Sequence, residues 1–377
     1  MAESFLPHVN GVTNSVLRIV EHLEHRGHEA VVVAAGTADQ IRAARAGSLQ
    51  HYESAPIVRW ASLPLPRYPQ VRLHLARTGT VADVLREIEP DVVHLASPFF
   101  IGMPTVRAAM SLNLPTVAVY QTDVASFVER YGLGMMRPLV WRHLRAIHRS
   151  ADRTLAPSSA AIEDLRSQGV PRVHLWQRGV DSQRFSPAHR DLALHDQWAP
   201  RGEVVVGYLG RLAPEKQVED LAALRSLPGV RVVVVGDGPS RSDLQRRLPE
   251  ARFTGQLGGI ELSRAVASFD VMVHTGPHET FCQSVQESLA SGVPVVSVGA
   301  GGPIDLVDHS RSGWLYPVGD LDSMRDHVRD LAGDGRKRAA MGRYARESVR
   351  HRTWESVGDD LLTHYGESRL RTRALAG

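Results

Sequence analysis

The segment Glu279-Thr-Phe-Cys-Gln-Ser-Val-Gln-Glu287 stands between two short apolar runs, Val271-Met-Val-His274 and Val293-Pro-Val-Val296. Short runs rich in β-branched residues are typical of buried strands, and the stretch between them has the spacing of a helix. A strand, loop, helix and second strand in this order build a parallel sheet. The first acid of the segment is therefore expected in a loop, and the second just over one turn into the helix.

The same alternation runs along the whole chain and predicts an α/β fold. Short apolar runs bounded by Gly, Pro or polar turns occur at residues 30–35, 92–95, 116–120, 204–209, 232–235, 271–273 and 293–298. Stretches with helical periodicity, such as residues 12–26 and 81–88, separate them. This pattern favours parallel sheets covered on both faces. A chain of 377 residues exceeds what one core usually serves, so two domains are expected.

Composition narrows the class of protein. The chain has an ordinary apolar fraction of 43%, no run of eighteen apolar residues and no secretory signal pattern, so we expect a cytoplasmic protein. A formal net charge of +3 is too small to indicate a nucleic-acid partner. The single cysteine, Cys282, excludes an internal disulfide, and a buried inert thiol is favoured over a reactive one.

The two acids of the segment, Glu279 and Glu287, are spaced so that they can contact opposite ends of one nucleotide sugar. The helix that begins near Gln283 leaves unpaired N–H groups and a positive dipole end, which attract phosphate. Glu279, before that helix, can accept hydrogen bonds from a sugar, and Glu287, inside it, from a ribose. The sequence therefore predicts a nucleotide-sugar site.

Four motifs carry a resemblance to a known family. They are the E-x7-E segment, Ala2-Glu-Ser-Phe-Leu-Pro-His-Val-Asn-Gly-Val-Thr-Asn14, Tyr120-Gln-Thr-Asp-Val-Ala125 and Arg178-Gly-Val-Asp181. Through them, residues 2–362 resemble the retaining glycosyltransferases of family four, above all the GDP-mannose-dependent α-mannosyltransferases of bacterial glycolipid assembly. The resemblance implies the GT-B fold, in which two Rossmann-like domains with parallel sheets face one another across a cleft.

This fold predicts the domain boundaries. Residues 1–183 would form the acceptor-binding domain, and residues 202–353 the nucleotide-sugar-binding domain. The proline-containing segment 184–201 interrupts the strand and helix rhythm and is predicted to be the linker. By family likeness, the helix in residues 354–377 would cross back to the first domain.

The beginning of the chain departs from the family pattern. In the family, the motif that starts at Ala2 follows a first, central strand, whereas here only Met1 precedes it. We therefore expect the natural protein to begin several residues upstream. The resemblance also implies a glycine loop that faces the donor phosphate; Asn10 replaces its first glycine, and Gly11 would carry the role. An ordinary helix start is the alternative for this loop.

Arg211 and Lys216 follow the strand predicted at 204–209, at the carboxyl edge where open α/β sheets bind ligands. The resemblance implies that both hold the diphosphate and neutralise it as it leaves. A structural ion pair with Glu215 or Glu219 is the alternative.

Further residues are assigned to the transferred sugar by the resemblance. Gln121 stands where many relatives have histidine; it can orient a hydroxyl but cannot act as a base at neutral pH. Asp123 is the ionisable candidate for contact with donor sugar or acceptor, with a helix N-cap as the alternative. The backbone of Phe281, Cys282 and Gln283 is expected beside the sugar.

The resemblance implies retention of anomeric configuration without a protein nucleophile, the departing phosphate taking the acceptor's proton. In this scheme the protein positions the two substrates and stabilises the charge that develops on the leaving group. No histidine and carboxylate pattern indicates a metal, so we expect no metal and no cofactor besides the nucleotide-sugar substrate.

The acceptor side is predicted around residues 130–153, where six arginines accompany one acid, Asp152. Apolar residues there fall on one helical stripe: Met136, Leu139, Val140, Leu144 and Ile147. We expect contact with an anionic membrane through this segment. A helix with a core-facing stripe and solvated arginines is the alternative.

The favoured function is transfer of a hexose, with mannose from GDP-mannose preferred, to a glycolipid or phospholipid-linked acceptor. One alternative is transfer from a UDP-sugar to a small soluble acceptor. Others are a non-catalytic nucleotide-sugar-binding paralogue and a nucleotide-sugar epimerase. Donor base, sugar epimer, acceptor and oligomeric state leave no side-chain signature in the sequence.

Overall fold

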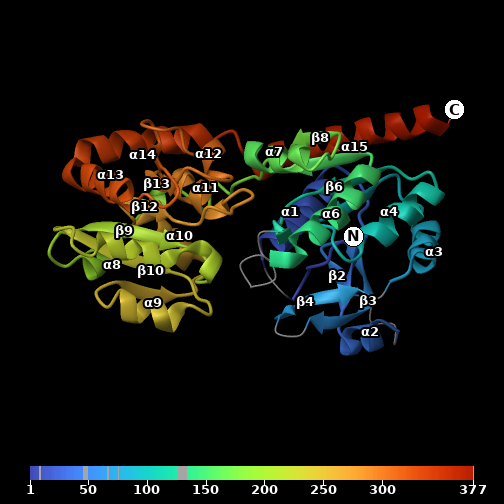
Figure 1. Cartoon of the computed structure of the whole chain (residues 1–377), viewed down its shortest axis with the longest axis horizontal. Coiled ribbons are helices and arrows are strands. Elements are labelled where there is room, and N and C mark those ends of the chain that lie inside the picture. Colours follow the sequence, from blue (N-terminus) through green and yellow to red (C-terminus); the bar gives the residue numbers. More distant parts are fainter. Residues whose placement is uncertain (8–9, 46–49, 66–67, 75, 126–133, 377) are drawn as a thin grey trace. The chain divides into compact units, whose positions relative to one another are not determined.

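A computed structural model describes residues 1–7, 10–45, 50–65, 68–74, 76–125 and 134–376. The chain divides into two compact units (Figure 1). Unit 1 comprises Met1–Arg178 and Trp354–Gly377, and unit 2 comprises Gly179–Thr353. Both have the α/β architecture that the alternating pattern predicts.

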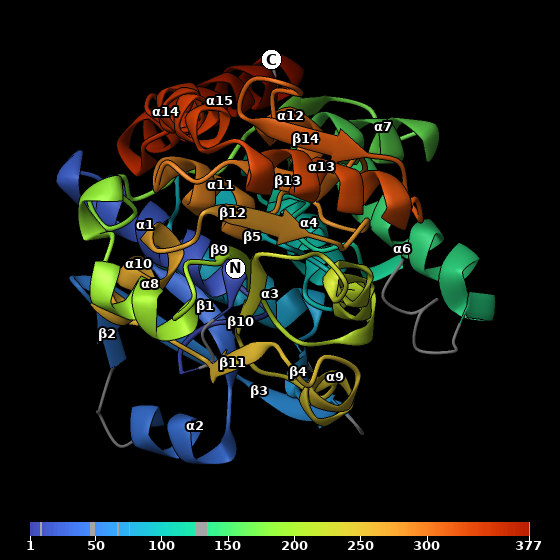
Figure 2. The same cartoon turned by 90° about the vertical axis from the view of Figure 1, so that its left-hand side faces the viewer.

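Unit 2 is built on a six-stranded parallel sheet (Figure 2). Its strands are β9 (Val204–Leu209), β10 (Val230–Val235), β11 (Arg252–Gly255), β12 (Val271–His274), β13 (Val295–Val298) and β14 (Gly313–Tyr316). They lie in the order β11-β10-β9-β12-β13-β14. Counted from β9, this is the order 3-2-1-4-5-6 of the doubly wound fold. The order reverses between β9 and β12.

Two apolar cores cover the two faces of this sheet. Along β10, Val233 and Val235 belong to one core, and Val232 and Val234 to the other. Successive strand side chains point to opposite faces, so a strand buried on both sides must be apolar throughout. The covering helices include α9 (Arg241–Arg247), α10 (Gly259–Ala267), α11 (Gln283–Ala290), α12 (Pro303–Leu306), α13 (Leu321–Gly333), α14 (Gly335–Val349) and the 3-10 segments η4 (Pro214–Lys216) and η5 (Val218–Leu224).

Residues 184–201, for which a linker was predicted, lie inside unit 2. They contain the 3-10 turn η3 (Pro187–His189) and helix α8 (Leu192–Trp198). Trp198 packs in the core of unit 2, and its ring lies 6.1 Å from that of Phe269. The prolines and polar residues that suggested a linker thus belong to a short helical segment attached to the sheet.

Unit 1 contains two four-stranded groups of strands. One is parallel, in the order β5 (Val93–Ala96), β6 (Thr116–Val119), β7 (Arg153–Ala156) and β8 (Val173–Leu175). In the other, β1 (Val32–Gly36) pairs in parallel with β3 (Ala55–Leu65), which pairs antiparallel with β2 (Gln50–Tyr52) and β4 (Tyr68–His74). The antiparallel pairs depart from the predicted parallel sheet, because the described residues 50–65 and 68–74 contain no helix that could form a crossover.

The helices of unit 1 have these bounds: α1 (Gly11–His25), α2 (Ala38–Arg45), α3 (Thr78–Ile88), α4 (Gly102–Ser111), α6 (Arg137–Ser150), α7 (Ser159–Ser167), α15 (Trp354–Ala376) and the 3-10 turn η2 (Gly134–Met136). The last of the long helices, α15, packs its buried Leu361 and Tyr365 against β6 and β7. The Nε1 of Trp176 donates a hydrogen bond of 2.9 Å to the carbonyl of Val357. These contacts attach the end of the chain to unit 1.

Ala2 lies between β1 and β5 and forms an isolated parallel bridge with each of them, to Ala34 and Ala96. Its N–H donates to the carbonyl of Val33 at 2.8 Å. Ala2 thus occupies the position where the family's first strand was expected. A natural start upstream of Met1 stays a prediction.

Candidate functional site

The point where the strand order of unit 2 reverses collects the predicted donor residues. Arg211 and Lys216 follow β9, and Glu279 follows β12. These neighbouring strands feed helices on opposite faces of the sheet, so their loops diverge at the carboxyl edge, which is where open α/β sheets bind ligands. The topology therefore brings together residues that are more than sixty positions apart in the chain.

Lys216 and Glu279 form an ion pair in which Nζ donates to Oε1. The two side chains are 22% and 16% exposed. Thr275 Oγ1 donates to the carbonyl of Lys216 at 2.7 Å and ties the β9 loop to the β12 loop. Burial lowers the pKa of Lys216, but the Glu279 carboxylate outweighs it and the pKa is raised above its ordinary value. The side chain therefore stays an ammonium ion.

Arg211 pairs instead with Glu215, four residues along the chain. This is the structural ion pair that stood as the alternative for the Arg211 and Lys216 motif. The Arg211 side chain is still 49% exposed, so the pair leaves donor groups of its guanidinium in contact with solvent. Its role in binding a diphosphate stays a prediction.

His274, the last residue of β12, is a member of this site that the sequence analysis missed. Its Nε2 lies 3.5 Å from Glu279 Oε1 and 3.6 Å from Cys282 Sγ, and 3.1 Å from the carbonyl of Gly276. Burial lowers the pKa of His274, so the imidazole is neutral near pH 7. A histidine that ends a run of buried apolar residues at the carboxyl edge of a strand is the signal that would have found it.

Cys282 is 5% exposed and adopts a left-handed backbone conformation with φ of 80°. Burial raises the pKa of its thiol to about 12, so it remains protonated, in agreement with the inert thiol that was favoured. Among the described residues, His274, Glu279 and Cys282 offer metal-ligand atoms within 4.8 Å of one another. The ammonium of Lys216, already bound to Glu279, opposes a cation at this position.

Helix α11 begins at Gln283, as predicted, and Cys282 provides no side-chain cap. The N–H of Val285 is directed at the Cys282 sulfur, and the N–H groups of Gln283 and Ser284 open the helix at the carboxyl edge of the sheet. The predicted neighbours of the sugar are positioned by other contacts: the Phe281 side chain packs in the core, and Gln283 Nε2 donates to the carbonyl of Gly179 at 3.1 Å. Contact between the backbone of these residues and a sugar stays a prediction.

The loop after β13 packs against the backbone of the E-x7-E segment. The N–H of Gly302 donates to the carbonyl of Glu279 at 2.7 Å. A Cβ on Gly302 would lie 2.2 Å from the carbonyl oxygen of Phe281, and one on Gly301 would lie 2.5 Å from that of Glu279. Both glycines are therefore required for the close approach of the two loops.

Glu287 lies one turn into α11 and is half-buried. Burial raises the pKa of its carboxyl to about 8, and the charge of Arg184 opposes this shift only partly. Among the described residues, none donates a hydrogen bond to the Glu287 carboxyl. Such a group can accept hydrogen bonds from a ligand hydroxyl.

A second group of predicted residues lies in unit 1. Asn10 is the N-cap of α1, and its Oδ1 accepts from the N–H groups of Val12 and Thr13 at 3.0 and 2.9 Å. The helix start, which stood as the alternative for this loop, is therefore present. The carbonyl of Gly11 accepts from Arg178 Nη1 at 3.2 Å.

Arg178 was noted only as part of a motif, yet it joins two predicted site residues. Its Nη2 donates to Gln121 Oε1 at 2.6 Å, while its Nη1 contacts Gly11. This bond fixes the orientation of the Gln121 amide, which is 6% exposed. Asp123 accepts a hydrogen bond of 3.3 Å from the hydroxyl of Tyr120, and residues 124–125 continue as helix.

Four arginines of the arginine-rich segment, Arg137, Arg142, Arg145 and Arg149, lie in α6, and Arg153 begins β7. Arg130 falls outside the described residues. The apolar stripe of the segment divides: Val140, Leu144 and Ile147 are buried, as the core-facing alternative predicts, whereas Met136 and Leu139 are exposed. Within the described part of the chain, every helix is too short or too polar to span a bilayer.

Comparisons with known proteins agree with this architecture. The family model described as "Glycosyltransferase Family 4" matches residues 9–184, and that described as "Glycosyl transferases group 1" matches residues 193–348. A "GDP-mannose-dependent alpha-mannosyltransferase" of Mycobacterium tuberculosis is 48% identical, covering 98% of this chain and 96% of the relative. A protein of the same description from Corynebacterium glutamicum is 44% identical, covering 97% and 88%.

A solved structure shares the fold. Anabaena HepE, in complex with UDP and glucose, superposes with a TM-score of 0.73 at 19% identity, covering 96% of this chain and 98% of HepE. The motifs, the doubly wound sheet and the full-length relatives lead to one conclusion. The chain is a glycosyltransferase with the GT-B fold and belongs to glycosyltransferase family 4.

Proposed function

We propose that this enzyme transfers mannose from GDP-mannose to a lipid-linked acceptor, with retention of configuration and without a metal. The observation that carries the site assignment is the Lys216 and Glu279 ion pair beside the start of α11, where the strand order reverses. The choice of GDP-mannose rests on the full-length relatives described as GDP-mannose-dependent alpha-mannosyltransferases.

In this proposal, the diphosphate of the donor lies between the ammonium of Lys216 and the N–H groups that open α11. Arg211, half exposed beside Glu215, adds its guanidinium to the phosphate oxygens. Negative charge grows on the diphosphate as the glycosidic bond breaks, so fixed positive groups stabilise the transition state more than the ground state. Glu279 then accepts hydrogen bonds from hydroxyls of the transferred sugar.

The acceptor's proton goes to the departing phosphate on the same face of the sugar. The side chains assigned to the sugar support a proton transfer to phosphate rather than to the protein. The Gln121 amide cannot take a proton at neutral pH, and the Asp123 carboxylate accepts a hydrogen bond from the Tyr120 hydroxyl. Arg178, through its bond to Gln121, orients that amide so that its N–H groups can donate to a hydroxyl. The protein's part is positioning and charge stabilisation.

Binding of GDP at pH 7 is expected to release more protons from the native enzyme than from Glu287→Gln. The carboxyl of Glu287, with its pKa raised to about 8, is mostly protonated at pH 7 without ligand. Ribose hydroxyls that donate to it favour the carboxylate and lower the pKa, so a proton leaves. Calorimetry in two buffers of different ionisation enthalpy measures the difference, which approaches one proton per GDP. Equal release by both proteins contradicts the ribose contact.

The activity test is incubation of the full-length protein with GDP-mannose, UDP-glucose or UDP-N-acetylglucosamine, with and without a membrane lipid extract. We expect GDP release together with mannose-labelled lipid only in the reaction with GDP-mannose and lipid. Reaction with a UDP-sugar alone contradicts the mannose assignment and favours the alternative donor. Donor binding without transfer or hydrolysis favours a non-catalytic paralogue, and isomerisation without acceptor favours an epimerase.

A further inference from the structure

The strand order of unit 1 reverses at Ala2, beside β5. Ala2 bridges β1 on one side and β5 on the other, so the order in space is β3, β1, Ala2, β5 and β6. The chain reaches β1 and β3 first, and β5 and β6 only later. Open α/β sheets bind ligands at the carboxyl edge where the strand order reverses. In unit 1 this place lies between Glu3, which follows Ala2, and residues 97–101, which follow β5 and are here called the β5 loop.

The two segments at this place lead to helices on opposite faces of the sheet. Ile19 of α1 packs in one core with Val117 of β6. Ala109 of α4 packs in another core with Ala118, the next residue of the same strand. Segments that lead to opposite faces diverge from one another. A side chain that joins them therefore sets the shape of the edge between them.

Glu3 is the side chain that joins them. Its Oε1 accepts from the N–H of Phe99 at 2.6 Å and from the N–H of Ile101 at 2.8 Å. The N–H of Phe100 also faces the carboxylate. Burial raises the pKa of Glu3 to about 7, although the three N–H groups oppose this shift, so the carboxylate predominates at pH 8. Hydrogen bonds to a charged acceptor are stronger than those between neutral groups.

Two further contacts hold the β5 loop from other elements. Ser97 has a left-handed φ of 54°, and its Oγ donates to Thr122 Oγ1 at 2.9 Å. Thr122 belongs to the segment 121–123, which the sequence assigns to the transferred sugar and the acceptor. From α6, the Nε2 of His143 donates to the carbonyl of Phe99 at 2.7 Å. The loop is thus fixed between Glu3, the segment after β6 and α6.

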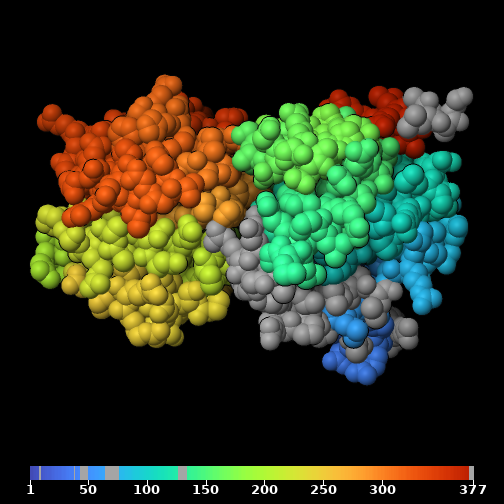
Figure 3. All heavy atoms as spheres, in the orientation of Figure 1, coloured from blue at the N-terminus to red at the C-terminus, as the bar shows by residue number. Residues whose placement is uncertain are grey.

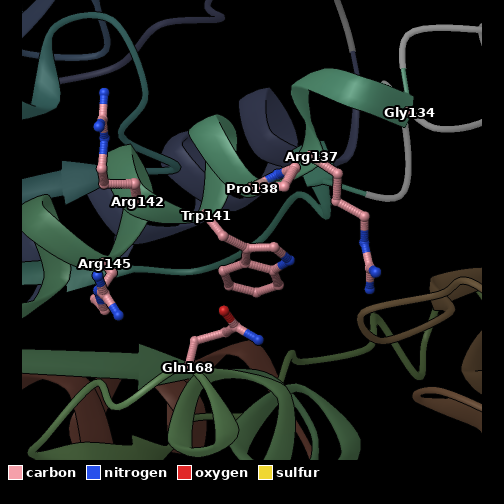
Figure 4. Close-up of a pocket in the computed structure, with 7 residues that line it drawn as sticks. All are labelled: Gly134, Arg137, Pro138, Trp141, Arg142, Arg145 and Gln168. Atoms are coloured by element: carbon pink, nitrogen blue, oxygen red, sulfur yellow. The ribbon is translucent and has the colours of Figure 1, made fainter.

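Helix α6, which provides one of these contacts, is held by its own packing. It lies beside α4, and the two helices form neighbouring green and teal surfaces of unit 1 in Figure 3. The indole of Trp141 stacks on Tyr120, with ring centroids 6.2 Å apart. Figure 4 shows this indole extending from α6 toward Gln168, in a pocket of about 460 Å³. Among the described residues that line this pocket, none belongs to the β5 loop, so the pocket is separate from the edge that Glu3 shapes.

We propose that Glu3 is a positioning residue for the acceptor, which holds the β5 loop in the arrangement that receives the acceptor's hydroxyl group. The inference rests on the proposed function for the existence of an acceptor, and it adds the place in unit 1 that receives it. The carboxylate occupies the N–H groups just before α4, where a helix start would otherwise attract a phosphate. This edge therefore suits a hydroxyl-bearing group rather than a second nucleotide.

The test is the lipid concentration that half-saturates mannose transfer. It is measured with the full-length protein at pH 8, with saturating GDP-mannose and the membrane lipid extract. Glu3→Gln keeps the size of the side chain but loses its charge. We expect the half-saturating lipid concentration to rise about tenfold, as weakening of a charge-assisted hydrogen bond predicts, while GDP binding and kcat stay close to native. A native half-saturating concentration in this variant overturns the proposal.

The matched control is Asp152→Asn in the same unit. The Oδ2 of Asp152 also accepts from a backbone N–H, that of Thr116 at 2.9 Å, but Thr116 begins β6 and lies at the amino edge of the sheet. This variant should lower thermal stability and leave the half-saturating lipid concentration native. An equal rise in both variants would show that Glu3 acts only through stability, which overturns the proposal.

A second variant changes the β5 loop without touching Glu3. His143→Phe keeps an aromatic ring against Phe99 but removes the Nε2 donor, and we expect a smaller rise in the same lipid concentration. Hydrogen exchange of residues 97–101 gives a readout without acceptor. Faster exchange in Glu3→Gln supports the hold on the loop, and native exchange contradicts it.

The same experiment separates this inference from the proposed function. If the native protein transfers mannose and Glu3→Gln has the native half-saturating lipid concentration, only the role of Glu3 is contradicted. If the native protein transfers no mannose to the extract, the proposed function is contradicted, and the acceptor role of Glu3 with it.

Discussion

Replacing Glu279 with glutamine is expected to lower kcat/KM for transfer by about 10²–10³-fold, the range seen when one electrostatic contact to a transition state is removed. The amide keeps the size of the side chain but loses the charge that holds Lys216 and accepts bonds from the sugar. Lys216 then loses the partner that raises its pKa. Steady-state kinetics with GDP-mannose and the native acceptor measure the change.

The fold should survive this substitution, because Glu279 lies outside the apolar cores of unit 2. The matched control is Glu261→Gln, an exposed acid on α10 of the same unit, which should leave both activity and thermal stability unchanged. The double variant Lys216→Ala/Glu279→Ala should lose little more than either single variant, since two residues that act as a unit are not additive. Full activity of Glu279→Gln would contradict the assignment of Glu279 to the donor site.

Substitution Gly302→Ala is expected to lower kcat/KM by about 10²-fold or more and to reduce the free energy of unfolding by about 1–3 kcal/mol. Its backbone, with φ of −60° and ψ of −30°, is open to alanine, so conformation is not the obstacle. The new Cβ would lie 2.2 Å from the carbonyl oxygen of Phe281. Because that neighbour is backbone, the segment between Glu279 and the start of α11 must move.

Gly333→Ala is the matched control for this prediction. Gly333 ends helix α13, and a Cβ there meets no atom within 4 Å. Alanine in a helix is favoured over glycine by up to about 1 kcal/mol, so this variant should be as stable as the native protein or slightly more so. Denaturant unfolding and transfer kinetics on both variants test the argument. Native kinetics in Gly302→Ala would show that the two loops do not depend on one another.

Several parts of the fold could be predicted because they depend on local periodicity. β9 has the predicted bounds, and α11 begins at the predicted residue. The helix predicted at residues 12–26 was observed as α1, Gly11–His25. Buried strands of a doubly wound sheet must be apolar on both faces, and helices must repeat every three to four residues, so both leave a pattern that a single sequence displays.

The antiparallel strands β2 and β4 and the packed segment at 184–201 were not predicted. Their partners lie elsewhere in the fold: β2 and β4 both pair with β3, and Trp198 packs in the core of unit 2. Alternation alone cannot distinguish a parallel from an antiparallel neighbour, and prolines within a chain do not distinguish a linker from a short helix that is held by one buried ring.

The sequence by itself determined the class of fold, the family and the residue types of the candidate donor site, because these reside in short motifs whose spacing is set by one strand, one loop and one helix turn. Only the tertiary structure decided which groups meet. In unit 2, Glu279 pairs with Lys216, 63 positions away, and lies near His274, while Arg211 pairs with Glu215 and Gly302 packs against Phe281. In unit 1, Arg178 contacts Gln121. Strand order and loop packing bring such residues together, and neither is encoded in the local pattern around any one of them.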